Sequence, residues 1–181
     1  QFDPFWDVMG DLDMPFYLHP RNPLPSMAQI YEGHPWLLGP TWAFGQETAV
    51  HSLRLMASGL FDKHPNLQIV LGHMGEGLPY SMWRIDNRNK WVGDERAYPA
   101  KKMLGEYFQD NFYITTSGNF RTQTLIDAML EIGSDRILFS ADWPFENVDH
   151  AANWFDTCTI SEDDRKKIGR TNSMRLFGID I

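Results

Sequence analysis

Three apolar segments of this sequence each end at a side chain that can bind a metal ion or transfer a proton. The segment–residue pairs are 14–18 before His19, 68–72 before His73, and 136–141 before Asp142. Imidazole and carboxylate groups are common metal ligands and common general acids or bases. If the segments are parallel strands, their carboxyl ends meet on one face, where α/β barrels carry out their chemistry. The pattern therefore predicts a metal-dependent lyase or hydrolase site.

Each of these side chains, taken alone, also has a structural explanation. His19 could be a hydrogen-bonded structural histidine, and Asp142 could cap the turn that follows it. His73 is followed three residues later by Glu76. That spacing suits a carboxylate that orients a catalytic or ligand histidine, but it equally suits a helix-capping pair. The single residues leave these alternatives open, whereas the order of all three favours a site.

Strands and helices alternate along the chain in the manner of βαβ units. Apolar and β-branched stretches predict four strands, over residues 14–18, 67–71, 112–116 and 137–139. Helical spacing predicts helices over residues 44–61, 78–91, 100–109, 122–132 and 148–158, with a last helix or two to residue 177 after a capping-box-like Ser161. The prediction is an α/β fold with a parallel sheet.

Four such units in 181 residues make about half of a (β/α)₈ barrel, which typically needs about 250 residues. The chain opens inside a helix-like segment at residues 2–6. We therefore expect residues 1–181 to be part of a single barrel domain, with the N-terminal half missing from this chain. The turn-rich stretch 19–40, with five prolines, is long enough to be a functional loop.

Composition excludes several classes of partner. The net charge is −8 and the basic residues are scattered, which disfavours nucleic acid. No apolar run approaches the ~18–20 residues of a membrane span. The single cysteine, Cys158, is expected to be a small core residue, and it predicts a reducing compartment and a cytoplasmic protein. No glycine fingerprint of a nucleotide site follows any strand, so no organic cofactor is predicted.

Four further histidines receive no catalytic role. His64 lies in a polar turn and is expected to be solvated. His51 lies beside core positions of a helix and is interpreted as a structural histidine. His34 and His150 are left without a role.

Four segments together resemble the decarboxylase branch of the amidohydrolase superfamily. They are residues 16–20, 71–76, 115–120 and 137–146. Within that branch, the proline-rich loop and residues 42–51 most resemble the γ-resorcylate (2,6-dihydroxybenzoate) decarboxylases rather than the salicylate and 2,3-dihydroxybenzoate enzymes. The resemblance covers nearly the whole chain. It implies that residues 1–181 are the C-terminal half of a distorted (β/α)₈ TIM barrel of the metal-dependent amidohydrolase type.

The resemblance implies the roles of individual residues. His19 and Asp142 would bind one divalent metal ion, Zn²⁺ or Mn²⁺. His73 would be a catalytic histidine beside the metal, with Glu76 and Arg84 in support. Asp142 in its protonated form would deliver a proton to the substrate, with His73 as its partner. The family also carries a Glu-x-His pair at the end of its first strand, and this chain has no such first strand.

The expected reaction is the nonoxidative, reversible decarboxylation of a hydroxybenzoate, most of all 2,6-dihydroxybenzoate to resorcinol and CO₂. Phe145 and Trp143 would contact the small aromatic substrate, and the resemblance implies a homotetramer. A metal-dependent hydrolase of the lactonase type is the alternative, in which the same metal activates water. A third possibility is a catalytically silent half-barrel.

Overall fold

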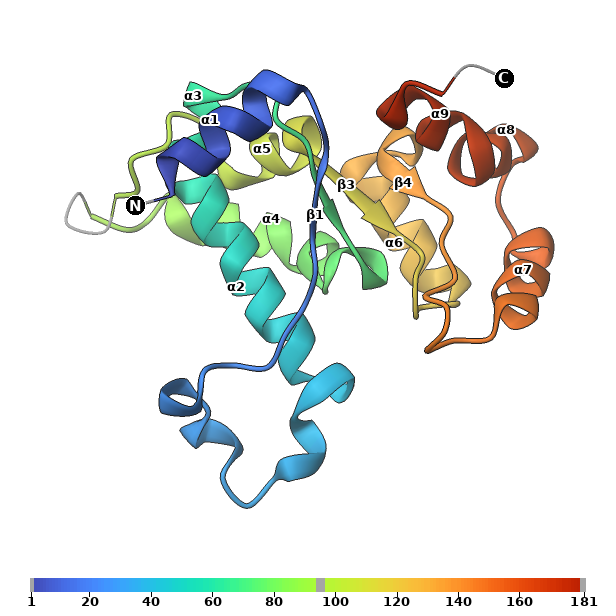
Figure 1. The fold of residues 1–181 in the computed structure, drawn as a ribbon, viewed down its shortest axis with the longest axis horizontal. Helices are drawn as coiled ribbons and strands as arrows, with labels where there is room; N and C mark the ends of the chain where they lie inside the picture. Colours follow the sequence, from blue (N-terminus) through green and yellow to red (C-terminus); the bar gives the residue numbers. More distant parts are fainter. Residues whose placement is uncertain (1, 94–96, 180–181) are drawn as a thin grey trace.

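The computed structural model describes residues 2–93 and 97–179 and contains a four-stranded parallel sheet (Figure 1). Its strands are, in order across the sheet, β1 (Phe16–Leu18), β2 (Ile69–Leu71), β3 (Phe112–Thr115) and β4 (Ile137–Leu138). Spatial order equals chain order, and every pair is parallel, as in successive βαβ units. The predicted α/β class and the four predicted strands are confirmed.

Consecutive strand residues point to opposite faces of the sheet, and both faces are covered. On one face, Leu71, Ile114 and Ile137 are fully buried in the main core. On the other face, Val70, Tyr113 and Leu138 form a smaller cluster against the C-terminal helix. Burial on both sides explains why these strands are nearly continuous apolar runs rather than alternating ones.

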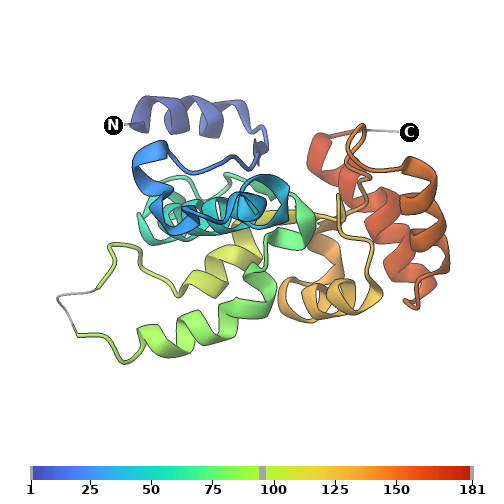
Figure 2. The ribbon, with the colours of Figure 1, turned by 90° about the horizontal axis from the view of Figure 1, so that it is seen from below.

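Helices pack around this sheet, and Figure 2 shows them in a view turned by 90°. They are α1 (Asp3–Leu12), α2 (Ala43–Ala57), α3 (Leu60–Lys63), α4 (Leu78–Asn89), α5 (Leu104–Asn111), α6 (Thr122–Ile132), α7 (Val148–Thr157), α8 (Glu162–Lys166) and α9 (Asn172–Phe177). The α-helical side chains of the main core come mostly from α2, α4, α5 and α6. Among the described residues, no helix is long and apolar enough to cross a membrane.

Two helices differ from the prediction at their ends. The helix expected over residues 44–61 ends at Ala57, because Gly59, with φ +82°, turns the chain before α3 begins. The helix expected from residue 100 begins only at Leu104. There the carboxylate of Asp86 accepts hydrogen bonds from the main-chain N–H groups of Leu104 and Gly105, at 3.0 and 2.9 Å. A carboxylate from α4 thus fixes where α5 starts.

Two of the expectations for histidines were wrong. His64 is not solvated: its side chain is 14% exposed and lies under α1, with Nε2 3.2 Å from the Asp7 carboxylate. His51 is exposed on α2 rather than enclosed beside the core. The expectations for Cys158, which is buried, and for Ser161, whose hydroxyl caps α8, are confirmed.

The stretch between β1 and α2 contains four short 3₁₀ turns instead of a regular element. In Figure 1 it forms an arm that projects away from the helices. Large apolar side chains on it are exposed, among them Met27, Ile30 and Trp36. The predicted long, irregular loop is therefore present.

Candidate functional site

A cavity of about 550 Å³ lies at the carboxyl ends of the strands. Its lining residues are Tyr17, His19, Pro20, His73, Ser140, Ala141, Asp142, Trp143 and Phe145. The volume is within the range of small-molecule sites, which runs from about 300 to 1,000 Å³. The cavity brings together the three strand-end residues that the sequence predicted, and the two predicted aromatic contacts.

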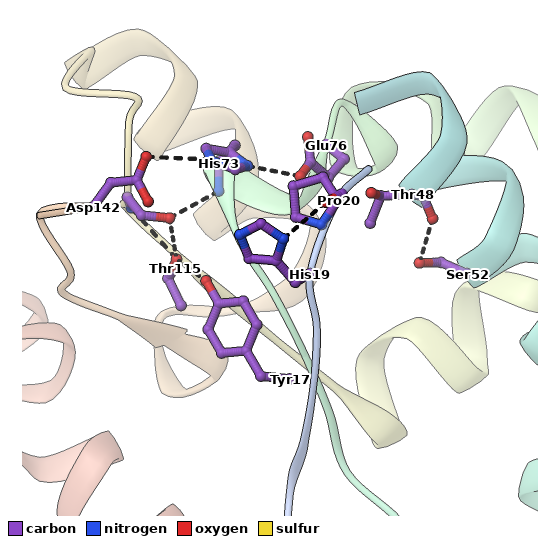
Figure 3. Close-up of polar contacts among 10 residues, drawn as sticks. Tyr17, His19, Pro20, Thr48, Ser52, His73, Glu76, Thr115 and Asp142 are labelled. Atoms are coloured by element: carbon purple, nitrogen blue, oxygen red, sulfur yellow. Dashed lines mark hydrogen bonds and ion pairs between the residues drawn. The ribbon is translucent and has the colours of Figure 1, made fainter. Parts of the chain in front are cut away.

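His19 is held in the tautomer that a metal ligand needs. Its Nδ1 lies 2.8 Å from the main-chain oxygen of Pro20, as Figure 3 shows. A carbonyl oxygen can only accept, so Nδ1 carries the hydrogen and the Nε2 lone pair is left for another partner. Ligand histidines are typically fixed in this way by a hydrogen bond from their second ring nitrogen. His19 therefore fits a divalent metal ion at the cavity.

His73 stands between two carboxylates. Its Nδ1 lies 2.7 Å from Oε1 of Glu76, and its Nε2 lies 3.6 Å from Oδ2 of Asp142 (Figure 3). The hydrogen bond to Glu76 is the main cause that raises the pKa of His73 above its ordinary value; burial opposes the shift, and Asp142 adds to it. The protonated form of His73 is thereby favoured. Such an imidazole can hold and return a proton at the cavity wall.

Glu76 orients His73 and does not cap a helix. Its side chain is 5% exposed, and it lies against the main chain of α2 at Gly45. The N-cap position of α4 is Gly77, which offers no side chain to the helix. Of the two alternatives that the sequence left open, the structure therefore contains the carboxylate–histidine pair and not the helix cap.

The main chain at the site is unusual. His73, Met74 and Glu76 have φ values of +49°, +57° and +56°, and Asp142 has +73°. The left-handed conformation costs a non-glycine residue about 1–2 kcal/mol. Backbone strain of this kind is concentrated at functional sites, where the surrounding structure enforces it.

The sequence analysis missed a row of hydroxyl groups that runs from Tyr17 at the cavity wall to the buried residues Thr115 and Ser117. The Tyr17 hydroxyl lies 3.4 Å from Oγ1 of Thr115, which lies 2.8 Å from Oγ of Ser117. The Ser117 hydroxyl in turn accepts a hydrogen bond from the main-chain N–H of His73 at 3.2 Å. Ser117 follows β3 as His73 follows β2, and that strand-end position is the signal that could have found it.

Arg84 and Glu76 are predicted site residues that do not line the cavity; Glu76 contacts His73, whereas for Arg84 no such contact is seen among the described residues. Arg84 is exposed on α4 and is not among the residues that line the pocket. Its supporting role stays a prediction.

His19 and Asp142, the two predicted metal ligands, do line the cavity, with His73 between Glu76 and Asp142. No group of three or more histidine, cysteine, aspartate or glutamate side chains within residues 2–93 and 97–179 could hold a metal ion. A metal bound to this chain through His19 and Asp142 would need further ligands from elsewhere.

Comparisons with known proteins agree on one family. The family model described as Amidohydrolase matches residues 1–179. A gamma-resorcylate decarboxylase from Rhizobium radiobacter is 72% identical over 180 residues, which are 99% of this chain and 55% of that protein. The chain thus spans about half the length of the curated relatives it matches.

Solved structures of related proteins have the same fold as this chain. A dihydroxybenzoic acid decarboxylase from Polaromonas sp. JS666, with bound manganese and the inhibitor 2-nitroresorcinol, has a TM-score of 0.93 at 72% identity, over 97% of this chain and 53% of that one. A 2,6-dihydroxybenzoate decarboxylase complexed with 2,6-dihydroxybenzoate has a TM-score of 0.93 at 72% identity, over 97% and 54%. The expected amidohydrolase-type fold is therefore confirmed, with this chain covering about half of it.

Proposed function

This chain belongs to the amidohydrolase family, and we propose that the polypeptide that carries it is a metal-dependent carboxy-lyase acting on 2,6-dihydroxybenzoate. The reaction is the nonoxidative, reversible release of CO₂ to give resorcinol. One observation carries the proposal: His73 stands between the Glu76 and Asp142 carboxylates at the wall of a cavity flanked by exposed aromatic rings. Relatives 71–72% identical to this chain that are named for this activity support it.

The difficult step is proton transfer to the ring carbon that bears the carboxyl group, because it interrupts aromaticity. Asp142 in its protonated form gives that proton, and its position beside Nε2 of His73 lets the imidazole replace it. The bond between ring carbon and carboxyl carbon then breaks. Its electron pair restores the aromatic ring, and CO₂ leaves. In the reverse direction Asp142 takes the proton back.

The walls of the cavity orient the substrate. Trp143 and Phe145 are 76% and 83% exposed and lie directly after Asp142, so an aromatic ring can stack on them. His19 and Asp142 would hold one divalent ion, Mn²⁺ or Zn²⁺. That ion supplies Lewis-acid stabilisation of negative charge on the substrate oxygens. The manganese-bound neighbour structure supports the choice of a divalent metal.

The remaining features of the proposal concern the whole protein. Residues 1–181 would form part of a single barrel domain, whose other strands bring a Glu-x-His pair to the metal. Within the described part of the chain, the outer edges of β1 and β4 pair with no further strand, and this supports the proposal because unpaired strand edges invite further pairing. We also propose a homotetramer in the cytoplasm. Analytical ultracentrifugation of the natural polypeptide and fractionation of its native cells test these two statements.

The activity is tested on the natural polypeptide, with its metal removed by chelation and then restored as Mn²⁺ or Zn²⁺. We expect 2,6-dihydroxybenzoate to yield equal amounts of CO₂ and resorcinol with metal, and neither product without it. Release of acid from lactones with no CO₂ from any hydroxybenzoate would instead assign a hydrolase. No turnover of either substrate class by the metal-loaded protein would contradict both.

A further inference from the structure

We propose that Ser117 is a positioning residue: its hydroxyl holds the main chain of His73 in the left-handed conformation that places the imidazole between Glu76 and Asp142. The inference rests on the proposed function for its kinetic consequences, but the geometry that it describes belongs to the chain itself. Ser117 does not line the cavity, so it acts only through His73.

The first step is the conformation of His73. Its φ of +49° lies in the left-handed region, whereas the ordinary helical value is near −60°. Relaxation to that value would rotate the residue by about 110° around its N–Cα bond. The rotation would carry Cβ and the ring away from the two carboxylates that now lie at 2.7 and 3.6 Å. The position of the ring therefore depends on a main-chain conformation that histidine does not favour.

The second step is the anchor. The peptide N–H of His73 donates to Oγ of Ser117 at 3.2 Å, which ties the turn after β2 to the turn after β3. Ser117 is 2% exposed, so water does not readily replace it as the acceptor. Without this oxygen the partly buried N–H of His73 would lose its acceptor, which is unfavourable. Rotation of the peptide toward another acceptor then relieves both the unmet hydrogen bond and the strain.

The third step is what holds Ser117 itself. Its hydroxyl lies 2.8 Å from Oγ1 of Thr115, which is 3% exposed and belongs to β3. A Cβ added at Gly72 would lie only 3.2 Å from Oγ of Ser117 and 3.2 Å from the hydroxyl of Tyr17. The hydroxyl groups are thus packed directly against the main chain that precedes His73. The anchor is rigid because a strand supports it and a glycine lets it approach.

The test compares Ser117→Ala with Ser52→Ala in the natural, metal-loaded polypeptide. Ser52 is the matched control, because it is also buried and its hydroxyl donates one hydrogen bond, to the main-chain oxygen of Thr48 within α2 (Figure 3). Both variants lose a buried hydroxyl, so both lose some stability. Only Ser117→Ala removes the partner of His73.

We expect Ser117→Ala to lower kcat on 2,6-dihydroxybenzoate about 10- to 100-fold, as a displacement of a catalytic group by about 1 Å does. Its KM should change less than about threefold and its metal content should stay the same, because the metal ligands and the cavity walls are untouched. Ser52→Ala should keep the parent kcat. A Ser117→Ala enzyme whose kcat is within about twofold of the parent would overturn the inference.

Amide hydrogen exchange gives an independent readout that needs no turnover. The His73 amide should exchange at least about tenfold faster in Ser117→Ala than in the parent or in Ser52→Ala, because its acceptor is gone. If the parent protein does not decarboxylate hydroxybenzoates, the proposed function fails, and amide exchange alone then tests whether Ser117 holds the main chain of His73. Unchanged exchange at His73 in Ser117→Ala would then refute the anchor.

Discussion

Gly118→Ala tests how closely the main chain after β3 must approach the catalytic pair. A Cβ added at Gly118 would lie 2.9 Å from Cδ2 of His73 and 3.4 Å from Oδ2 of Asp142. The first distance is shorter than real Cβ contacts allow, so the imidazole must move by about 0.5 Å to reach ordinary contact near 3.4 Å. Since a misplacement of about 1 Å can cost 100-fold in rate, we expect kcat/KM to fall about tenfold.

Backbone strain adds a second effect that must be separated from the first. Gly118 has φ +63°, where an alanine costs about 1–2 kcal/mol of folding free energy. Gly178, after α9, has a nearly equal φ of +61°, and a Cβ added there meets no atom of the described residues within 4 Å. Gly178→Ala therefore imposes the same strain without the contact, and it is the matched control.

The assay measures kcat/KM on 2,6-dihydroxybenzoate, bound metal, and urea unfolding for both variants in the natural polypeptide. Both should lose about 1–2 kcal/mol of unfolding free energy. Only Gly118→Ala should lose activity. Some loss of metal is also expected in this variant, because the added Cβ lies close to the Asp142 carboxylate as well. Equal activity of the two variants would refute the reasoning that a Cβ at residue 118 displaces the His73 imidazole and thereby lowers activity.

Three further predictions follow from the same geometry. Glu76→Gln keeps a hydrogen-bond acceptor for His73 but removes the negative charge. A charge-assisted hydrogen bond contributes about 1.5–3 kcal/mol, so steady-state kinetics should show a kcat about 10- to 100-fold lower. An unchanged kcat would contradict the role of Glu76. Elemental analysis should show that His19→Ala loses the metal and that His73→Asn retains it. The kcat of His73→Asn should fall about 10²- to 10⁴-fold. The reverse pattern would make His73 the metal ligand and His19 the residue of proton transfer. The hydrogen bond from Tyr107 lowers the pKa of Asp62, so its contribution to stability is present above the unfolded pKa of about 4 and is lost as pH falls through the folded value. In urea unfolding, Asp62→Asn should therefore differ from the parent at pH 7. The difference should shrink as pH falls below about 4 and disappear below the folded pKa of Asp62, whereas a constant difference would argue against this linkage.

The sheet could be predicted from the sequence because its strands are buried on both faces and so appear as short apolar runs. Helix α6 was predicted with its observed bounds, Thr122–Ile132, since the apolar spacing runs through the segment and Gly133 follows directly after it. The start of α5 could not be predicted in this way. It is set by the carboxylate of Asp86, which lies 18 residues before Leu104 in the sequence and reaches it only in the folded chain.

The same distinction between local pattern and contacts between distant residues applies to the site. Convergence of His19, His73 and Asp142 on one cavity was predictable, because parallel strands place their carboxyl ends on one face. Ser117 was not found, because serine and threonine are common in turns and a single hydroxyl gives no pattern. Its importance comes from a partner 44 residues away, the N–H of His73, and only the register of β2 against β3 brings the two together.

The residues with left-handed main-chain conformations show why the turns of the site could not be predicted from the sequence. Five non-glycine residues in the described part of the chain have positive φ, and four of them are at the site: His73, Met74, Glu76 and Asp142. Glycine would remove about 1–2 kcal/mol of strain at each of these positions, yet at His73, Glu76 and Asp142 it would also remove the imidazole or a carboxylate. The sequence therefore keeps side chains where the backbone favours glycine. The strain is tolerated because hydrogen bonds from outside the turn, such as that of Ser117, hold the conformation in place.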